Sequence, residues 1–169
     1  VVELRPFDPA CVSGLWKASL GSDVWRYMPM WLESEQQMAS FVQNACRLAE
    51  QGSGLGFAVR RREDGECIGG TGLWEFSAQH RRVEIGATWL ARSHQRTAAN
   101  TEAKLLLLGH AFDGLGCLRV EFKTDFRNSQ SRAALERIGA TQEGVLRAHM
   151  ILPDGSRRDS VYYSILADE

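Results

Sequence analysis

Hydrophobic residues in the first half of the chain follow the helical period in two stretches and the strand period in four. In chain order, the predicted elements are a strand over Val1–Arg5, a helix over Asp8–Leu20, a helix from Ser34 to Gly52, and antiparallel strands over Phe57–Arg61, Cys67–Trp74 and Val83–Leu90. The second helix opens with Ser34-Glu-Gln-Gln, which has the form of a capping box. Between the two helices, the segment Val24–Leu32 is aromatic and rich in Met, and it is broken by Pro29.

The second half of the chain alternates two more helices with further strands. The predicted elements are a loop over Gln95–Ala99, a helix capped by Asn100, a strand over Leu118–Thr124, a helix capped by Asn128 that runs to Ile138, and a hairpin of Gly144–Leu152 with Arg157–Leu166. The first of these helices is apolar on most faces from Ala103 to Phe112, so we expect it to be buried. Helices interleave with a mostly antiparallel sheet, which predicts an α+β or mixed α/β fold in one domain over residues 1–169.

The segment from Glu84 to Asp113 has the order strand, loop and helix. Backbone N–H groups at the start of a helix point outward and bind anions. Such a site suits a nucleotide diphosphate or a carboxylate, although an ordinary strand-to-helix connection has the same pattern.

Composition narrows the class of protein. With 169 residues, 44% of them hydrophobic, the chain has ample material for one core. A net charge of −1 argues against a dedicated nucleic-acid binder, and no apolar run is long enough to span a membrane. No signal peptide is visible. Cys11, Cys46, Cys67 and Cys117 are scattered, which predicts neither a zinc site nor a disulfide framework and favours reduced thiols in the cytoplasm.

Three motifs carry a family resemblance. They are Glu84-Ile-Gly-x-x-Trp-Leu, Gln95-x-x-x-x-Asn100-x-Glu-Ala-Lys, and the run Arg119-Val-Glu-Phe-Lys-Thr-Asp-x-x-Asn-x-x-Ser-Arg-Ala-Ala-Leu-x-x-Ile-Gly-Ala. Together they resemble the GNAT acetyltransferase superfamily, and more narrowly its RimJ/RimL branch, whose named members acetylate protein N-termini. The resemblance covers nearly the whole chain. It implies a strongly twisted mixed sheet, flanked by helices and splayed between its fourth strand (83–90) and fifth strand (118–124), where the pantetheine arm of acetyl-CoA enters.

The resemblance also implies a set of contacts to coenzyme A. The expected contacts are Gln95, Arg96, Thr97, Ala98, Ala99, Asn100 and Thr101 at the diphosphate, and Trp89, Leu90, Ala91, Asn128 and Ser131 along the pantetheine arm. The family pattern is Gln/Arg-x-x-Gly-x-Gly/Ala, and here Ala98 and Asn100 replace its small residues. Alanine disfavours positive φ, but the loop amides still converge if Ala98 is helical.

Acetyl transfer to an amine needs a neutral amine, a donor to the developing oxyanion and a hydrogen-bond donor to the departing thiolate. Many family members use a tyrosine on the last helix as that final donor. Leu135 stands at that position, and Ser131 is the RimL-like substitute. Glu84 is the first candidate base, with an ion pair to Arg82 or Arg119 as the structural alternative. His149 is the second candidate, and its alternative is an exposed hairpin residue.

The acceptor pocket is expected near the aromatic segment. Its candidate residues are Trp25, Tyr27, Met28, Trp31 and Trp74, which suit peptide recognition or, alternatively, form a satellite core. The sequence therefore predicts an acetyl-CoA-dependent N-acetyltransferase, without a metal, whose favoured acceptor is a peptide or protein N-terminus. A small amine (polyamine, amino acid or aminoglycoside) and a non-catalytic acyl-CoA-binding module remain open alternatives. The sequence also leaves a homodimer open.

Overall fold

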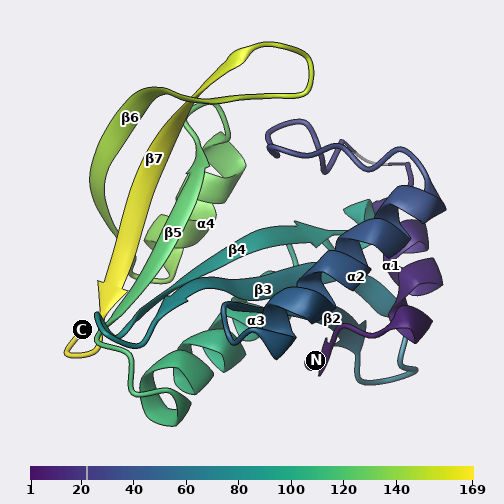
Figure 1. The fold of residues 1–169 in the computed structure, drawn as a ribbon, viewed down its shortest axis with the longest axis horizontal. Helices are drawn as coiled ribbons and strands as arrows, with labels where there is room; N and C mark the ends of the chain where they lie inside the picture. The colour runs from purple at the N-terminus through teal and green to yellow at the C-terminus, as the bar shows by residue number, and fades with distance from the viewer. Residues whose placement is uncertain (22) are drawn as a thin grey trace.

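The computed structural model describes residues 1–21 and 23–169, and its core is one seven-stranded sheet in the order β1-β2-β3-β4-β5-β7-β6 (Figure 1). The strands are β1 (Val2–Pro6), β2 (Gly54–Arg61), β3 (Cys67–Ser77), β4 (Arg82–Leu90), β5 (Arg119–Asp125), β6 (Thr141–Ile151) and β7 (Arg157–Leu166). Strands β4 and β5 pair in parallel, and the other neighbouring strands pair antiparallel. The predicted mixed α/β class is confirmed.

Helices cover both faces of this sheet. They are α1 (Val12–Ser19), α2 (Glu35–Glu50), α3 (Ala98–Gly109) and α4 (Ser129–Arg137), with short 3-10 turns at Pro9–Cys11 and Arg92–His94 and a π turn at His110–Gly114. On one face, α1 and α2 pack through Leu15, Met38 and Val42 against side chains that include Trp89. On the other face, Leu107 of α3 and Leu135 of α4 pack against β4, β5 and β7. Within the described residues, no helix has the length and apolar character needed to span a membrane.

The sheet is splayed between β4 and β5. These strands pair only at Arg82–Arg119, Val83–Val120 and Glu84–Glu121, and they diverge beyond Glu84 (Figure 1). Strands β5, β6 and β7 with α4 therefore form one half of the molecule, and β1 to β4 form the other. The splay predicted between the fourth and fifth strands is confirmed, and Glu84 lies at its apex.

The start of α3 differs from the prediction. Thr97 is the N-cap: its backbone is extended, and its Oγ1 accepts a hydrogen bond from the Ala99 N–H at 3.3 Å. Asn100 lies inside the first turn, so its prediction as the N-cap is wrong. Threonine and asparagine are both common N-cap residues, so the sequence offers two starts three positions apart. The helix begins after the earlier one, Thr97.

The prediction that α3 is buried on most faces is also wrong. Its buried apolar stripe is Ala99, Ala103 and Leu107, whereas Leu105 is 68% exposed. Helix α4 agrees with its prediction, because Asn128 Oδ1 accepts from the Ser131 N–H at 3.0 Å and caps the helix.

Candidate active site

A cavity of about 310 Å³ occupies the splay between β4 and β5. Its walls come from both of these strands, from α3 and α4, and from segment 23–28. At the start of α3 it joins a more open hollow of about 670 Å³, with which it shares Asp23, Gln95, Arg96 and Gln130. The combined space therefore runs from the N-terminus of α3 toward the apex of the splay.

The loop before α3 turns at Arg96, not at Ala98. Arg96 has a φ of +59°, Thr97 is extended and Ala98 is the first residue of the helix. The Gln95 side chain donates to the Leu90 carbonyl at 3.0 Å and ties this loop to the end of β4. Because Ala98 is helical, an alanine in place of glycine costs no strain there. The Ala99 N–H is used by the Thr97 cap, which leaves the other N–H groups of the first turn to bind an anion.

Strand β4 carries a bulge beside the cavity. Trp89 pairs with Gly70 and Gly86 pairs with Gly72, so Ala87 and Thr88 together oppose the single residue Thr71. Ala87 takes a φ of +48°, a left-handed conformation that is unfavourable for alanine. The bulge thereby reorients the backbone N–H groups of β4 at the edge that faces the splay.

The end of β4 offers fewer free backbone groups than predicted. The Ala91 N–H donates to the Ile68 carbonyl at 2.8 Å, and the Ala91 carbonyl accepts from the His94 N–H at 2.8 Å. The Ala91 N–H is therefore engaged within the protein, and a contact between Ala91 and the pantetheine arm stays a prediction for its carbonyl. Backbone groups of successive strand residues point to opposite edges of the strand. Because the Ala91 N–H points toward β3, the Leu90 N–H points the other way, into the splay. The Trp89 side chain is 3% exposed and packs in the core against Trp25.

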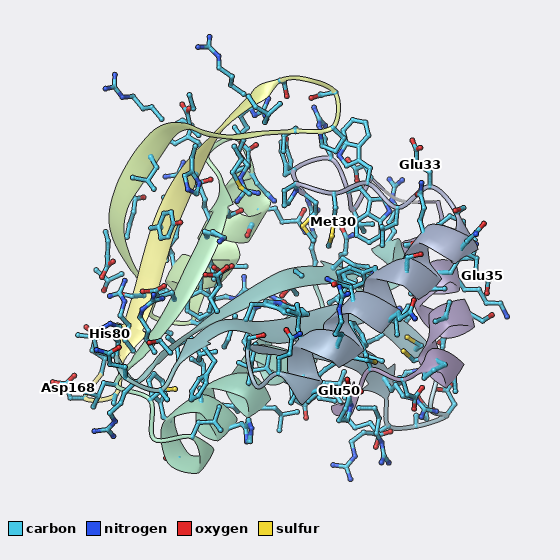
Figure 2. All side chains as sticks on the ribbon, viewed as in Figure 1. Met30, Glu33, Glu35, Glu50, His80 and Asp168 are labelled. Carbon is cyan, nitrogen blue, oxygen red and sulfur yellow. The ribbon has the colours of Figure 1, made fainter. Side chains whose placement is uncertain are left out.

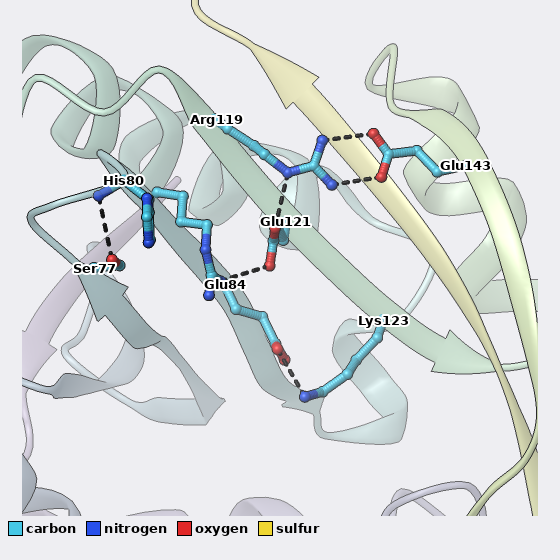
Figure 3. Close-up of polar contacts among 8 residues, drawn as sticks. Ser77, His80, Glu84, Arg119, Glu121, Lys123 and Glu143 are labelled. Carbon is cyan, nitrogen blue, oxygen red and sulfur yellow. Dashed lines mark hydrogen bonds and ion pairs between the residues drawn. The ribbon is translucent and has the colours of Figure 1, made fainter.

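Glu84 is buried at the apex, with 7% of its surface exposed. Burial raises the pKa of its carboxyl group, while the Lys123 ammonium at 2.8 Å opposes that rise. A Cβ added at Gly86 would lie 2.7 Å from Glu84 Oε1, so the carboxylate extends over Gly86, which lines the cavity. The ion pair with Lys123 is drawn in Figure 3.

The predicted alternative partners of Glu84 are engaged elsewhere. Arg82 and Arg119 donate to Glu121 at 3.1 and 2.8 Å, and Arg119 also pairs with Glu143 (Figure 3). The expectation of an Arg82–Glu84 or Arg119–Glu84 pair is therefore wrong. Lys123 reaches Glu84 because it lies two residues beyond the last β4–β5 pair, on the same side of its strand as Glu121.

The remaining catalytic candidates separate into two groups. Ser131 and Leu135 of α4 line the cavity, and Leu135 fills the position where the family tyrosine is expected. His149 is exposed on β6, outside the cavity lining, and its Nδ1 lies 3.0 Å from Ser160 Oγ. Asn128 lines the cavity as well as capping α4.

The predicted acceptor residues occupy two environments. Tyr27 and Met28 line the cavity, whereas Trp25 and Trp74 pack in the core formed with α1 and α2. The Trp31 indole N–H is buried and has no hydrogen-bond partner among the described residues. In Figure 2 the labelled residue Met30 marks the segment 24–32 that carries these side chains.

The comparisons with known proteins identify the family. The model of the "Acetyltransferase (GNAT) domain" matches residues 2–141. The chain belongs to the GNAT acetyltransferase family. The N-acetyltransferase YoaA of Bacillus subtilis is 30% identical over 135 residues, which cover 80% of this chain and 75% of YoaA. YdaF of the same organism, provisionally named a ribosomal N-acetyltransferase, is 35% identical over 106 residues, or 63% of this chain and 57% of YdaF.

A solved structure agrees with this assignment. The crystal structure of a GCN5-related N-acetyltransferase from Brucella melitensis superposes with a TM-score of 0.89 and 28% identity, over 99% of this chain and 76% of that one. GNAT enzymes use acetyl-CoA as cosubstrate, and three features of this chain fit it. They are the N-terminal end of α3, the edge of β4 that is unpaired with β5 beyond Glu84, and the cavity that joins them.

Sequence reasoning missed three charged or polar residues of this GNAT site: Lys104, Lys123 and Arg158. Arg158 is 4% exposed, and it donates to the Tyr27 carbonyl at 3.1 Å, which fastens segment 23–28 to β7. Lys104 is also buried, with 6% of its surface exposed, and its Nζ donates a hydrogen bond to Thr88 Oγ1. Two signals were available: Lys104 and Lys123 both stand in the motifs that carry the family resemblance, and Lys104 is the one charge in the apolar run 103–109, at helical spacing from Asn100.

Proposed function

We propose that this GNAT enzyme transfers the acetyl group of acetyl-CoA to the amine of a peptide or protein N-terminus, in the manner of the RimJ/RimL branch. The charge of the cavity is the observation that carries this acceptor class. Its described lining includes Lys104, Lys123, Arg158 and two other arginines, with Asp23 as the one carboxylate. Glu84 lies outside that lining, beside Gly86, and its charge is paired with Lys123. A polyamine or an aminoglycoside carries several positive charges and needs a carboxylate-rich pocket.

Two further features support a peptide acceptor. Tyr27 and Met28 provide an amphipathic wall that adapts to a chain with varied side chains. The relative YdaF carries the name of a ribosomal N-acetyltransferase, and ribosomal proteins present N-terminal amines. Both features fit a peptide or protein acceptor.

The binding of acetyl-CoA follows from the course of the cavity. The N–H groups of the first turn of α3, beside Arg96, hold the diphosphate. The Leu90 N–H and the Asn128 side chain bind the pantetheine amides, which places the thioester near the bulge at Ala87. The acceptor enters from the side of Tyr27, so both substrates are bound together and the amine attacks directly.

Glu84 serves as the base of this reaction. An α-amino group has a pKa of about 8 and is mostly protonated at neutral pH, so a proton must leave before attack. The carboxylate lies at the apex over Gly86, within reach of the amine directly or through one water. A backbone N–H of β4 at the bulge donates to the developing oxyanion.

Ser131 assists the leaving group through its hydroxyl. Ser131→Ala is expected to lower the single-turnover rate of acetyl transfer by about three- to tenfold, the cost of one hydrogen bond, while acetyl-CoA affinity stays nearly constant. Helix α4 keeps its cap, because Asn128 bonds to the Ser131 backbone N–H, not to its hydroxyl. An unchanged single-turnover rate would show that Ser131 only packs against the cavity.

The experiment that tests the function is an acceptor screen with acetyl-CoA and release of its thiol as the signal. The panel contains short peptides with free N-termini, the same peptides with blocked N-termini, spermidine, free amino acids and an aminoglycoside. The proposal predicts turnover with the free peptides and loss of that turnover on blocking. Faster turnover with a small amine than with the peptides would contradict the peptide acceptor and assign a small amine instead. Binding of acetyl-CoA without turnover on any amine would favour the non-catalytic acyl-CoA-binding module.

A further inference from the structure

We propose, on the basis of the acetyl-transfer function above, that Lys104 is a catalytic residue that gives its proton to the sulfur of coenzyme A as the thioester breaks. When the tetrahedral adduct collapses, the carbon–sulfur bond breaks and its electron pair goes to sulfur. The Lys104 ammonium then protonates that sulfur, which leaves coenzyme A as the free thiol and Lys104 as the neutral amine. The proton lost by the attacking amine is on Glu84, and exchange with water restores both groups.

The position of Lys104 places it beside the reacting end of the cavity. Thr97, Asn100 and Lys104 follow one another on the face of α3 that lines the cavity. Lys104 comes seven residues after Thr97, so it lies about 10 Å along the helix axis from Thr97, which is at the diphosphate end of this face. There its Nζ donates to Thr88 Oγ1 at 2.8 Å, next to the bulge at Ala87.

The burial of Lys104 calls for a functional reason. Its side chain is 6% exposed, and its Nζ lies 5.7 Å from the centre of the Phe122 ring. Within the described residues it forms no ion pair, since Glu84 pairs with Lys123. Lysine is almost never this buried without a counter-ion, because desolvating the ammonium is costly. Such an arrangement lowers stability and is retained chiefly at functional sites.

The electrostatics of the cavity suit a proton donor. Burial lowers the pKa of Lys104 to about 7, and the negative charge of Glu84 partly opposes that shift. An ordinary thiol has a pKa of about 8.5, so transfer of a proton from Lys104 to the thiolate is favourable. The other charged groups that line the cavity are Asp23, Arg96, Lys123, Arg137 and Arg158.

Neighbouring groups do not duplicate this role. Lys123 is held by Glu84, and Arg158 donates to the Tyr27 carbonyl and to Ser160 Oγ. An arginine also keeps its proton at any working pH. The Ser131 hydroxyl can donate a hydrogen bond to sulfur but is too weak an acid to carry the charge. Lys104 therefore supplies what the family tyrosine provides and Leu135 does not.

The direct test is the pH dependence of single-turnover acetyl transfer in the wild-type protein and in Lys104→Met. The donor acts only when protonated, so the wild-type rate is expected to lose its contribution as pH rises through the pKa of Lys104, about 7. Lys104→Met has no such donor, so this decline at high pH should be absent from its lower rate profile. Equal declines with rising pH in the two proteins would overturn the inference.

Kinetics and stability provide the second readout. Lys104→Met is expected to lower the single-turnover rate roughly 10- to 100-fold, with acetyl-CoA affinity unchanged within about threefold. Its thermal midpoint should not fall, because the variant replaces an unpaired buried cation with an apolar chain of similar length. A lower midpoint with an unchanged rate would make Lys104 structural. If the wild-type protein acetylated no amine, the proposed function would fail, whereas the same pH comparison on the slow hydrolysis of bound acetyl-CoA, which expels the same thiolate, would still decide the role of Lys104.

Discussion

Glu84→Gln is expected to lower kcat/KM for acetyl transfer by about 10² to 10⁴, the usual contribution of a general base. The base acts only when ionised, so activity falls as pH drops through the pKa of Glu84. Burial raises that pKa, and the acidic limb of the wild-type profile should therefore lie above the range of an ordinary glutamate. Glutamine keeps the size and the hydrogen-bonding capacity of the side chain over Gly86, and much of the acidic limb should disappear.

The matched control is His149→Ala. His149 is exposed on β6 and bonds to Ser160, so its loss should leave the limb and the rate nearly unchanged. If His149→Ala abolishes the limb while Glu84→Gln retains it, the base is the hairpin histidine. If neither variant alters the profile, the enzyme selects the neutral fraction of its amine, and the Glu84–Lys123 pair only holds β4 to β5.

Ala98→Glu is expected to weaken acetyl-CoA binding at least about tenfold, which corresponds to about 1.4 kcal/mol. Ala98 is exposed at the first position of α3, where a carboxylate would face the diphosphate. A glutamate there interacts favourably with the helix dipole, so the fold should be kept or slightly stabilised. Ala98 is a better position than Thr97 for this test, because Thr97 caps the helix.

Ala98→Gln is the control for Ala98→Glu. It has the same shape without the charge, and calorimetry should show affinity close to that of the wild-type protein. The difference between the two variants should shrink at high salt, since exposed charges are screened. Equal affinities of Ala98→Glu and the wild-type protein at low salt would place the diphosphate elsewhere.

The sequence predicted most of the fold because its signals were local. Period-two runs marked the strands, and Asn128 marked the start of α4 correctly. Two capping residues three positions apart made the start of α3 ambiguous, and only the structure shows that Thr97 is the cap. The splay followed from the family resemblance, and the short β4–β5 ladder that ends at Glu84 is its physical basis.

The site was less predictable, because its decisive contacts join distant segments. The bulge at Ala87 depends on the register of β4 against β3, and the residue with positive φ is an alanine, which the sequence does not mark as left-handed. Lys123 meets Glu84 only because β5 lies beside β4 at that register. Lys104 lies in an apolar helical run, where a lysine ordinarily faces solvent. Its burial depends on how α3 lies against the splay, and no local pattern reports that.

The central claim is tested most directly by locating the acetyl group on a peptide that carries both an α-amine and a lysine side chain. The protein is incubated with acetyl-CoA and this peptide, and fragmentation in a mass spectrometer identifies the modified nitrogen. The account predicts one acetyl group, on the α-amine, and loss of this product with Glu84→Gln. Acetylation confined to the lysine side chain, or no acetylated peptide while acetyl-CoA binds, would contradict it.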